Sequence, residues 1–143
     1  MALEYRVRGT IGTEELNALI SSSWEQPWAG NWSAILARSL TWVTAHEDGR
    51  LVGFAHVAWD GGAHAFLLDP TVHPSMRRKG VGTSLVRRAA QSARDSGAEW
   101  LHVDFEPQLE EFYTRCGFRL TKAGLLRLSS GTNWPRASYR TGS

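Results

Sequence analysis

A basic run followed by spaced glycines is the part of the sequence best suited to chemistry. Arg77, Arg78 and Lys79 are consecutive, and Gly80 and Gly82 follow where an amphipathic helix is expected to begin. A turn of this kind brings backbone N–H groups and the positive end of a helix to one place. Phosphate groups bind at such places. The segment therefore predicts an anion site, and most simply a phosphate site.

The spacing of the glycines distinguishes between three phosphate-binding patterns. A P-loop needs lysine directly after its second glycine, whereas Lys79 precedes Gly80. A dinucleotide-binding turn needs a third glycine three positions after Gly82, and Leu85 stands there. The third pattern is Arg-x-x-Gly-x-Gly after a strand that ends in Val-x-Pro. Residues 72–82 match this third pattern in full.

Apolar periodicity and turn residues predict the elements that must position this turn. Strands are predicted at 3–7, 42–46, 51–59, 63–72, 100–105, 118–121 and 125–128. Helices are predicted from Thr13 onward and over 32–39, 80–96 and 109–116. Pro70 interrupts the fourth strand and predicts a bulge or splayed end, because proline cannot donate to a ladder. This order predicts an α/β fold, a mixed α+β sheet of about seven strands with helices on both faces.

A second segment, Phe112-Tyr113 followed by Gly117-Phe118, has the form Phe-Tyr-x-x-x-Gly-Phe. The two segments, in this order along the chain, resemble the GCN5-related N-acetyltransferases, the GNAT superfamily. The resemblance covers about residues 41–128. It implies a mostly antiparallel sheet that splays between its fourth and fifth strands, and acetyl-CoA as the acetyl donor. The residues that it implies for cofactor binding are Val72, Arg77, Arg78, Lys79, Gly80, Val81, Gly82 and Thr83.

The turn suits the pyrophosphate of coenzyme A. Backbone amides from Arg78 to Thr83 would bond it, and Gly80 and Gly82 have no side chains to block its approach. Arg78 stands where the family often has glycine. Either this residue adopts a positive φ and strains the turn, or its side chain reaches a phosphate.

Acetyl transfer to an amine poses two proton problems. An alkyl amine, with a pKa of about 10, must lose a proton before it attacks, and the leaving thiolate departs more easily once protonated. The resemblance implies Tyr113 as the general acid, while the alternative is an aromatic core residue beside Phe112. Glu106 is the candidate base, at the end of the fifth predicted strand, where the family frequently has asparagine. Asp69, Asp104 and His73 are alternatives.

Trp24, Trp28 and Trp32 recur every four residues, in a chain with 7 tryptophans. In the family that the chain resembles, this region walls the acceptor site. Trp28 and Trp32 are therefore candidate acceptor-binding residues, and core packing is the alternative. Four histidines alternate with apolar residues on strands, namely His46, His56, His64 and His102, and their spacing predicts neither a metal site nor an acid partner.

Bulk properties exclude several functions. The chain has 143 residues, 42% of them hydrophobic and 21% charged, and we expect one N-acetyltransferase domain over 1–143 with a loosely ordered tail at 129–143. The net charge of +2 is small, and the basic residues are clustered in one part of the chain. Both facts argue against a nucleic-acid partner. No stretch approaches the about 20 apolar residues of a membrane span. A single cysteine, Cys116, and no leader segment predict a cytoplasmic protein.

These observations predict an acetyl-CoA-dependent N-acetyltransferase. The acceptor would be a primary amine of a small molecule or peptide, which attacks directly and without a covalent enzyme intermediate. The alternative is an acyl-CoA-binding sensor without catalysis. The resemblance also leaves a homodimer open.

Overall fold

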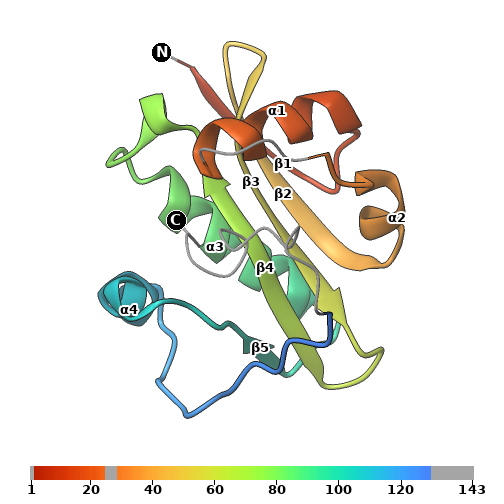
Figure 1. Cartoon of the computed structure of the whole chain (residues 1–143), viewed down its shortest axis with the longest axis vertical. Coiled ribbons are helices and arrows are strands. Elements are labelled where there is room, and N and C mark those ends of the chain that lie inside the picture. Colours follow the sequence, from red (N-terminus) through yellow and green to blue (C-terminus); the bar gives the residue numbers. More distant parts are fainter. Residues whose placement is uncertain (1, 25–28, 130–143) are drawn as a thin grey trace.

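Five strands form a single sheet in the order β1-β2-β3-β4-β5 (Figure 1). The computed structural model describes residues 2–24 and 29–129. The strands are β1 Leu3–Val7, β2 Ser39–Glu47, β3 Arg50–Trp59, β4 His64–Val72 and β5 Trp100–His102. The helices are α1 Thr13–Trp24, α2 Trp32–Ala37, α3 Val81–Asp95 and α4 Glu110–Arg115, with short 3₁₀ turns at Pro74–Met76 and Pro107–Leu109.

The first four strands are antiparallel neighbours. Short turns join β2 to β3 and β3 to β4, whereas the chain between β1 and β2 carries α1 and α2. Asp48 and Gly49 both have positive φ, of 49° and 85°, between β2 and β3. This is the geometry that an Asp-Gly hairpin predicts, because both central residues of the favoured turn are left-handed.

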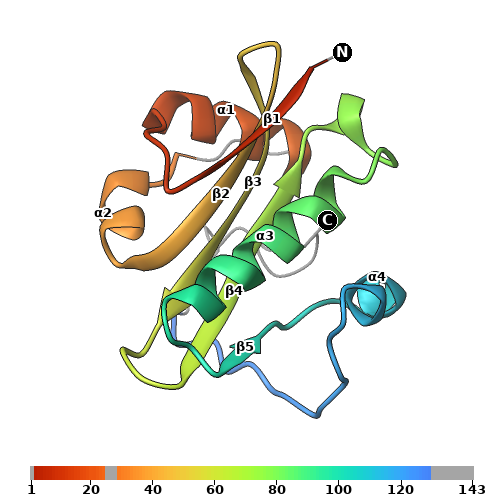
Figure 2. The same ribbon diagram turned by 180° about the vertical axis from the view of Figure 1, so that it is seen from behind.

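The helices cover both faces of the sheet, as predicted. α3 lies across one face (Figure 2), and its apolar repeat Val81, Leu85, Ala89 and Ala93 is buried against β2, β3 and β4. α1 and α2 lie on the other face, where a second core joins Leu16 and Ile20 to Phe54. Among the helices of the described residues, none is both long and apolar enough to cross a membrane.

The sheet opens between β4 and β5. These two strands run parallel and pair only over His64–Phe66 and Trp100–His102. β4 then continues to Val72, while the chain after His102 turns away toward α4 (Figures 1 and 2). The splay implied by the resemblance is therefore present, and it leaves a gap between the end of β4 and residues 103–107.

The prediction of about seven strands is wrong for the described part of the chain, which has five. Residues 118–121 and 125–128 are not strands, and Leu125, Leu126 and Leu128 are 66%, 84% and 91% exposed. A strand is stable only with a paired neighbour, and β5, the edge strand, is just three residues long. The fifth strand is also shorter than predicted, because it ends where the chain leaves β4. The predicted tail lies almost wholly outside the described residues.

Candidate active site

The turn before α3 has the geometry of an anion site. Gly80 is the residue before the helix, with φ of 79° in the left-handed region, and no side chain caps the first N–H groups of α3. A Cβ added to Gly80 would meet nothing within 4 Å, so this side of the turn is open. Arg77, Arg78 and Lys79 are all exposed beside it. The turn therefore presents free donors and positive charge to one open space.

The backbone conformation of Arg78 distinguishes between the two alternatives left by the sequence, a positive φ with a strained turn or a side chain that reaches a phosphate. Its φ is 63°, so it adopts the left-handed conformation that glycine adopts easily. This conformation costs a side-chain-bearing residue about 1–2 kcal/mol. The turn is therefore strained at Arg78.

The Cβ position of Gly82 faces α4 and the end of β4. A Cβ at this position would point toward Cζ of Phe112 at 3.5 Å and Cγ2 of Val72 at 3.7 Å. These are ordinary van der Waals distances, so an alanine side chain would fit between the start of α3, α4 and the end of β4. That Gly82 leaves room for a phosphate stays a prediction.

The end of α1 is tied to both β4 and the turn. The Ser23 hydroxyl donates to the Val72 carbonyl oxygen at 3.1 Å, and the Arg77 guanidinium donates to the Ser23 carbonyl oxygen at 3.3 Å. The helix that covers one face of the sheet is therefore bonded directly to the two segments expected to hold the cofactor.

A bulge interrupts β4 where Pro70 predicted an irregularity. Phe54 pairs with Thr71 and His56 pairs with Leu68, so Asp69 and Pro70 together oppose one residue of β3. Asp69 has φ of 52°. Its Oδ2 lies 2.8 Å from Nε2 of His56, and the two side chains are 20% and 5% exposed, respectively.

Tyr113 is fully buried beside the gap, at 0% exposure. Its ring stacks on Phe105 and meets Phe112 and Phe118 edge-on. Burial, more than the nearby Cys116 and Asp104, raises the pKa of the Tyr113 phenol. The phenol therefore stays protonated at neutral pH.

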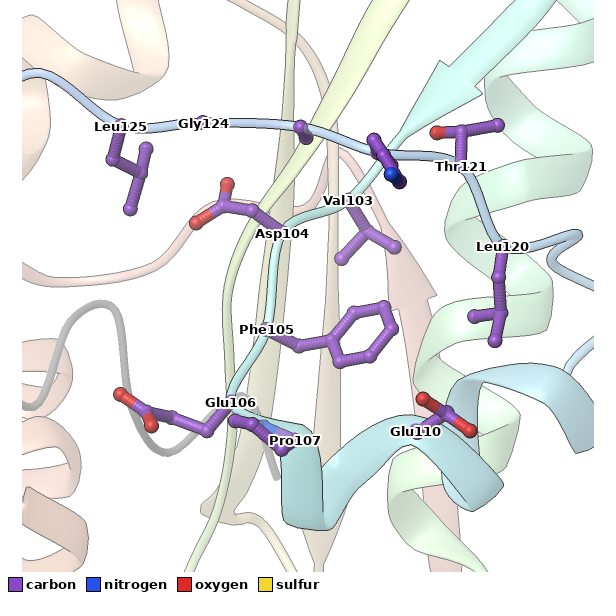
Figure 3. A pocket seen from close by; sticks show the side chains of 12 residues that line it. Val103, Asp104, Phe105, Glu106, Pro107, Glu110, Leu120, Thr121, Gly124 and Leu125 are labelled. Carbon is purple, nitrogen blue, oxygen red and sulfur yellow. The ribbon is translucent and has the colours of Figure 1, made fainter.

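Glu106 lies in a pocket of about 640 Å³ on the β5 side of the gap. Residues 103–107 and 120–125 form its walls, together with Glu110. Asp104 and Glu106 project to one side of the chain, while Val103 and Phe105 project to the other (Figure 3). The wall formed by the continuation of β5 therefore presents two carboxylates in the same direction.

Comparison with known proteins places this geometry in a family. The model of the acetyltransferase (GNAT) family matches residues 11–118. The chain belongs to the GNAT acetyltransferase family. The match includes both the turn before α3 and the segment from Phe112 to Phe118.

Individual relatives agree with this assignment. Mycothiol acetyltransferase from Nocardia farcinica is 32% identical over 80 residues, which is 56% of this chain and 26% of the relative. Streptothricin acetyltransferase from Streptomyces lavendulae is 38% identical over 86 residues, 57% of this chain and 46% of the relative. The chain thus spans only a quarter to a half of these relatives.

A solved structure has the same fold. The crystal structure of an aminoglycoside N-acetyltransferase in complex with CoA superposes on this chain with a TM-score of 0.71 and 19% sequence identity. The superposition covers 91% of this chain and 96% of the other. At this identity the similarity concerns the fold alone.

Of the two candidate acceptor-binding tryptophans, only Trp32 lies among the described residues. Trp32 is 1% exposed, donates to Asn17 Oδ1 at 2.9 Å and packs edge-on against Phe54. Burial of this degree is what the core-packing alternative predicts, and it leaves Trp32 no exposed surface for an acceptor. Trp28 lies outside the described residues.

The sequence interpretation missed the acid partner of His56. The only signal was the Asp69-Pro70 pair inside a predicted strand, and the contact depends on how the bulge turns Asp69. Over the described ranges, no group of three or more His, Cys, Asp or Glu side chains is arranged to hold a metal ion.

Proposed function

We propose that the protein transfers the acetyl group of acetyl-CoA to a primary amine of a small molecule or peptide by direct attack. The observation that carries this proposal is the open, uncapped turn at Gly80 next to the gap between β4 and β5. The turn suits a pyrophosphate, and the gap suits an extended arm that ends in a thioester. Family membership supplies the class of reaction.

The cofactor side consists of the turn and the end of β4. Backbone N–H groups from Arg78 to Thr83 would bond the pyrophosphate, and the exposed Arg77 and Lys79 would add positive charge. Backbone groups near Val72 border the gap, where β4 has lost its neighbour. Such groups can bond the extended arm and polarise the thioester carbonyl.

The acceptor side must remove a proton from the amine. Two carboxylates are candidates for this step: Glu106, the candidate from the sequence, in the pocket formed by residues 103–107 and 120–125, and Asp69, an alternative from the sequence, in the bulge of β4. After the nitrogen attacks the thioester carbonyl and the C–S bond breaks, the thiolate takes a proton. We assign this proton to Tyr113, the general acid that the family resemblance implies, because its phenol is protonated at neutral pH.

Two named relatives act on small molecules, mycothiol in one case and streptothricin in the other. These names support a small-molecule amine for this chain. Because the chain spans only part of each relative, their acceptors are not transferred to it.

The test is release of CoA thiol from acetyl-CoA in the presence of separate amines: an amino sugar, an aminoglycoside, an aliphatic diamine and a peptide with a free N-terminus. Turnover with at least one amine, above the amine-free rate, is the expected result. A non-catalytic sensor would bind CoA in calorimetry and release no thiol with any amine. This outcome would contradict the proposed function and support the alternative.

A further inference from the structure

The face of β4 and β5 opposite α3 carries a row of aromatic and acidic side chains. Ala65 and Leu67 of β4 pack in the core under α3. Leu101, Val103 and Phe105, from β5 and the segment after it, pack against the same core. Alternate side chains of an extended chain point to opposite faces. The side chains on the other face are therefore His64, Phe66, Trp100, His102, Asp104 and Glu106.

Three of these side chains form a platform of rings, which we call the ring platform. The rings of Phe66 and His102 are stacked, with centroids 4.7 Å apart and an angle of 20° between their planes. Nδ1 of His64 lies 2.8 Å from Nε2 of His102. Trp100 pairs with His64 and extends the row. Phe66 is 40% exposed and Trp100 is 52% exposed, so the platform is open to a ligand.

The ring platform lies at the base of the gap. Phe66 and His102 are the last residues of β4 and β5 that pair with each other, and the two strands separate directly after them. On the other side of Phe66, its partner on β3 is Ala58, which shares its face of the sheet and is too small to cover the ring. A ligand that enters the gap from this face therefore meets an aromatic surface at its base.

Negative charge follows the rings along one wall of the gap. Asp104 and Glu106 project to the same side of the chain (Figure 3). Asp104 is two residues beyond His102, or about 7 Å in an extended chain. Asp104 also lies near the proposed acid, because its charge, after burial and Cys116, helps to raise the pKa of the Tyr113 phenol. The row thus joins an aromatic surface to carboxylates beside the proposed reaction site.

We propose that the acceptor is a primary amine joined by a short chain to an aromatic ring, an inference that rests on the proposed acetyl transfer to an amine. The ring lies against the ring platform, and the ammonium lies at Asp104 and Glu106. Opposite charge selects the ammonium. Aromatic rings attract one another in offset-stacked or edge-on arrangements, and a saturated ring lacks the matching π-system.

The first test compares phenethylamine with cyclohexylethylamine in the thiol-release assay. The two amines share chain length, carbon number and charge, and they differ in the planarity of the ring. The ratio of their kcat/KM values should favour phenethylamine by about 2- to 10-fold, the range that an aromatic pair contributes beyond its buried area. A merely apolar surface would favour the saturated amine, which has the larger apolar surface. A ratio of one or less would overturn the inference.

Variants at the two ends of the row separate the ring from the charge. Phe66→Leu keeps an apolar side chain and should bring the ratio close to one, whereas Phe66→Tyr keeps the ring and should preserve it. Asp104→Asn should raise KM for both amines by about 2- to 5-fold, the range of an exposed ion pair, and leave the ratio unchanged. KM for acetyl-CoA should stay the same in all three variants.

Tyr5→Leu is the matched control for the loss of a ring. Tyr5 is a half-buried aromatic residue on β1, at the opposite edge of the sheet, and its ring is covered by the Arg88 guanidinium. This variant should keep the wild-type ratio of the two amines. If Phe66→Leu changes the ratio no more than Tyr5→Leu does, the platform does not bind the acceptor ring.

The second test measures binding without turnover. In NMR of protein labelled with ¹⁵N in histidine, phenethylamine added with CoA should shift the ring signals of His64 and His102. His46, which is 2% exposed on β2, should not move. Absence of a His102 shift at millimolar phenethylamine would overturn the inference, whether or not the protein acetylates amines. Selective shifts together with no thiol release from any amine would support the ring platform and contradict the proposed function.

Discussion

Gly80→Ala tests whether the turn before α3 binds the cofactor through its backbone. The added methyl group has free space, since nothing lies within 4 Å of its position, so any effect comes from the backbone conformation. A left-handed residue with a side chain costs about 1–2 kcal/mol. Reduced freedom of the unfolded chain returns about 0.4–1 kcal/mol. The variant should therefore lose about 1 kcal/mol of unfolding free energy, or about 3 °C in Tm for a domain of this size.

The effect on the cofactor should be larger. If the strained turn shifts, at least one N–H group loses its bond to a phosphate oxygen, and a hydrogen bond to a charged group contributes about 1.5–3 kcal/mol. The dissociation constant for CoA should then rise about 10- to 100-fold. Urea unfolding gives the first quantity, and isothermal titration calorimetry with CoA gives the second.

Gly61→Ala is the matched control for this experiment. Gly61 has φ of 83°, nothing lies within 4 Å of its added Cβ, and it belongs to the turn between β3 and β4. The two variants should lose similar stability, and only Gly80→Ala should weaken CoA binding. Equal CoA affinities in the two variants would refute the assignment of the turn as the phosphate site.

Three further predictions concern buried positions of the fold. Tyr113→Phe keeps the ring contacts and should lower kcat at least about 10-fold with an unchanged KM for acetyl-CoA, as measured by thiol release; unchanged turnover would remove the phenol from the reaction. Burial lowers the pKa of His46 below 6.5, so the unfolded chain binds more protons as pH falls through about 6.5 and the folded state loses stability. Urea unfolding at about pH 7 and pH 5.5 should show a smaller loss in His46→Gln than in wild type, and equal losses would contradict the assignment. Gly53→Ala would place a Cβ 2.9 Å from Leu85 Cδ1 and should destabilise the protein by about 1–3 kcal/mol in urea unfolding, whereas an unchanged midpoint would mean that α3 can shift away from the sheet.

Much of the site could be predicted from local sequence. The turn from Arg77 to Gly82 and the helix after it depend on residues close together in the chain, as does the hairpin at Asp48 and Gly49. Glycine conformation, helix periodicity and turn chemistry act over a few residues, so the residue types alone predict them. Pro70 marked the bulge in β4 for the same reason.

Other features depend on which strands pair and in what register. The residues expected as sixth and seventh strands have suitable composition, but no neighbour in the described structure pairs with them. The directions of the Gly82 and Asp69 positions also depend on packing, since one faces Phe112 on α4 and the other faces His56 on β3. No local rule reports such contacts.

Residue types and their spacing alone predicted the glycine turn before α3, the helices on two faces and the resemblance to the acetyltransferase family. The folded structure was needed to show that Tyr113 is buried, that Trp32 belongs to the core and that Asp69 contacts His56. Backbone preferences are set by neighbouring residues, whereas burial and side-chain hydrogen bonds depend on residues brought together from separate strands and helices.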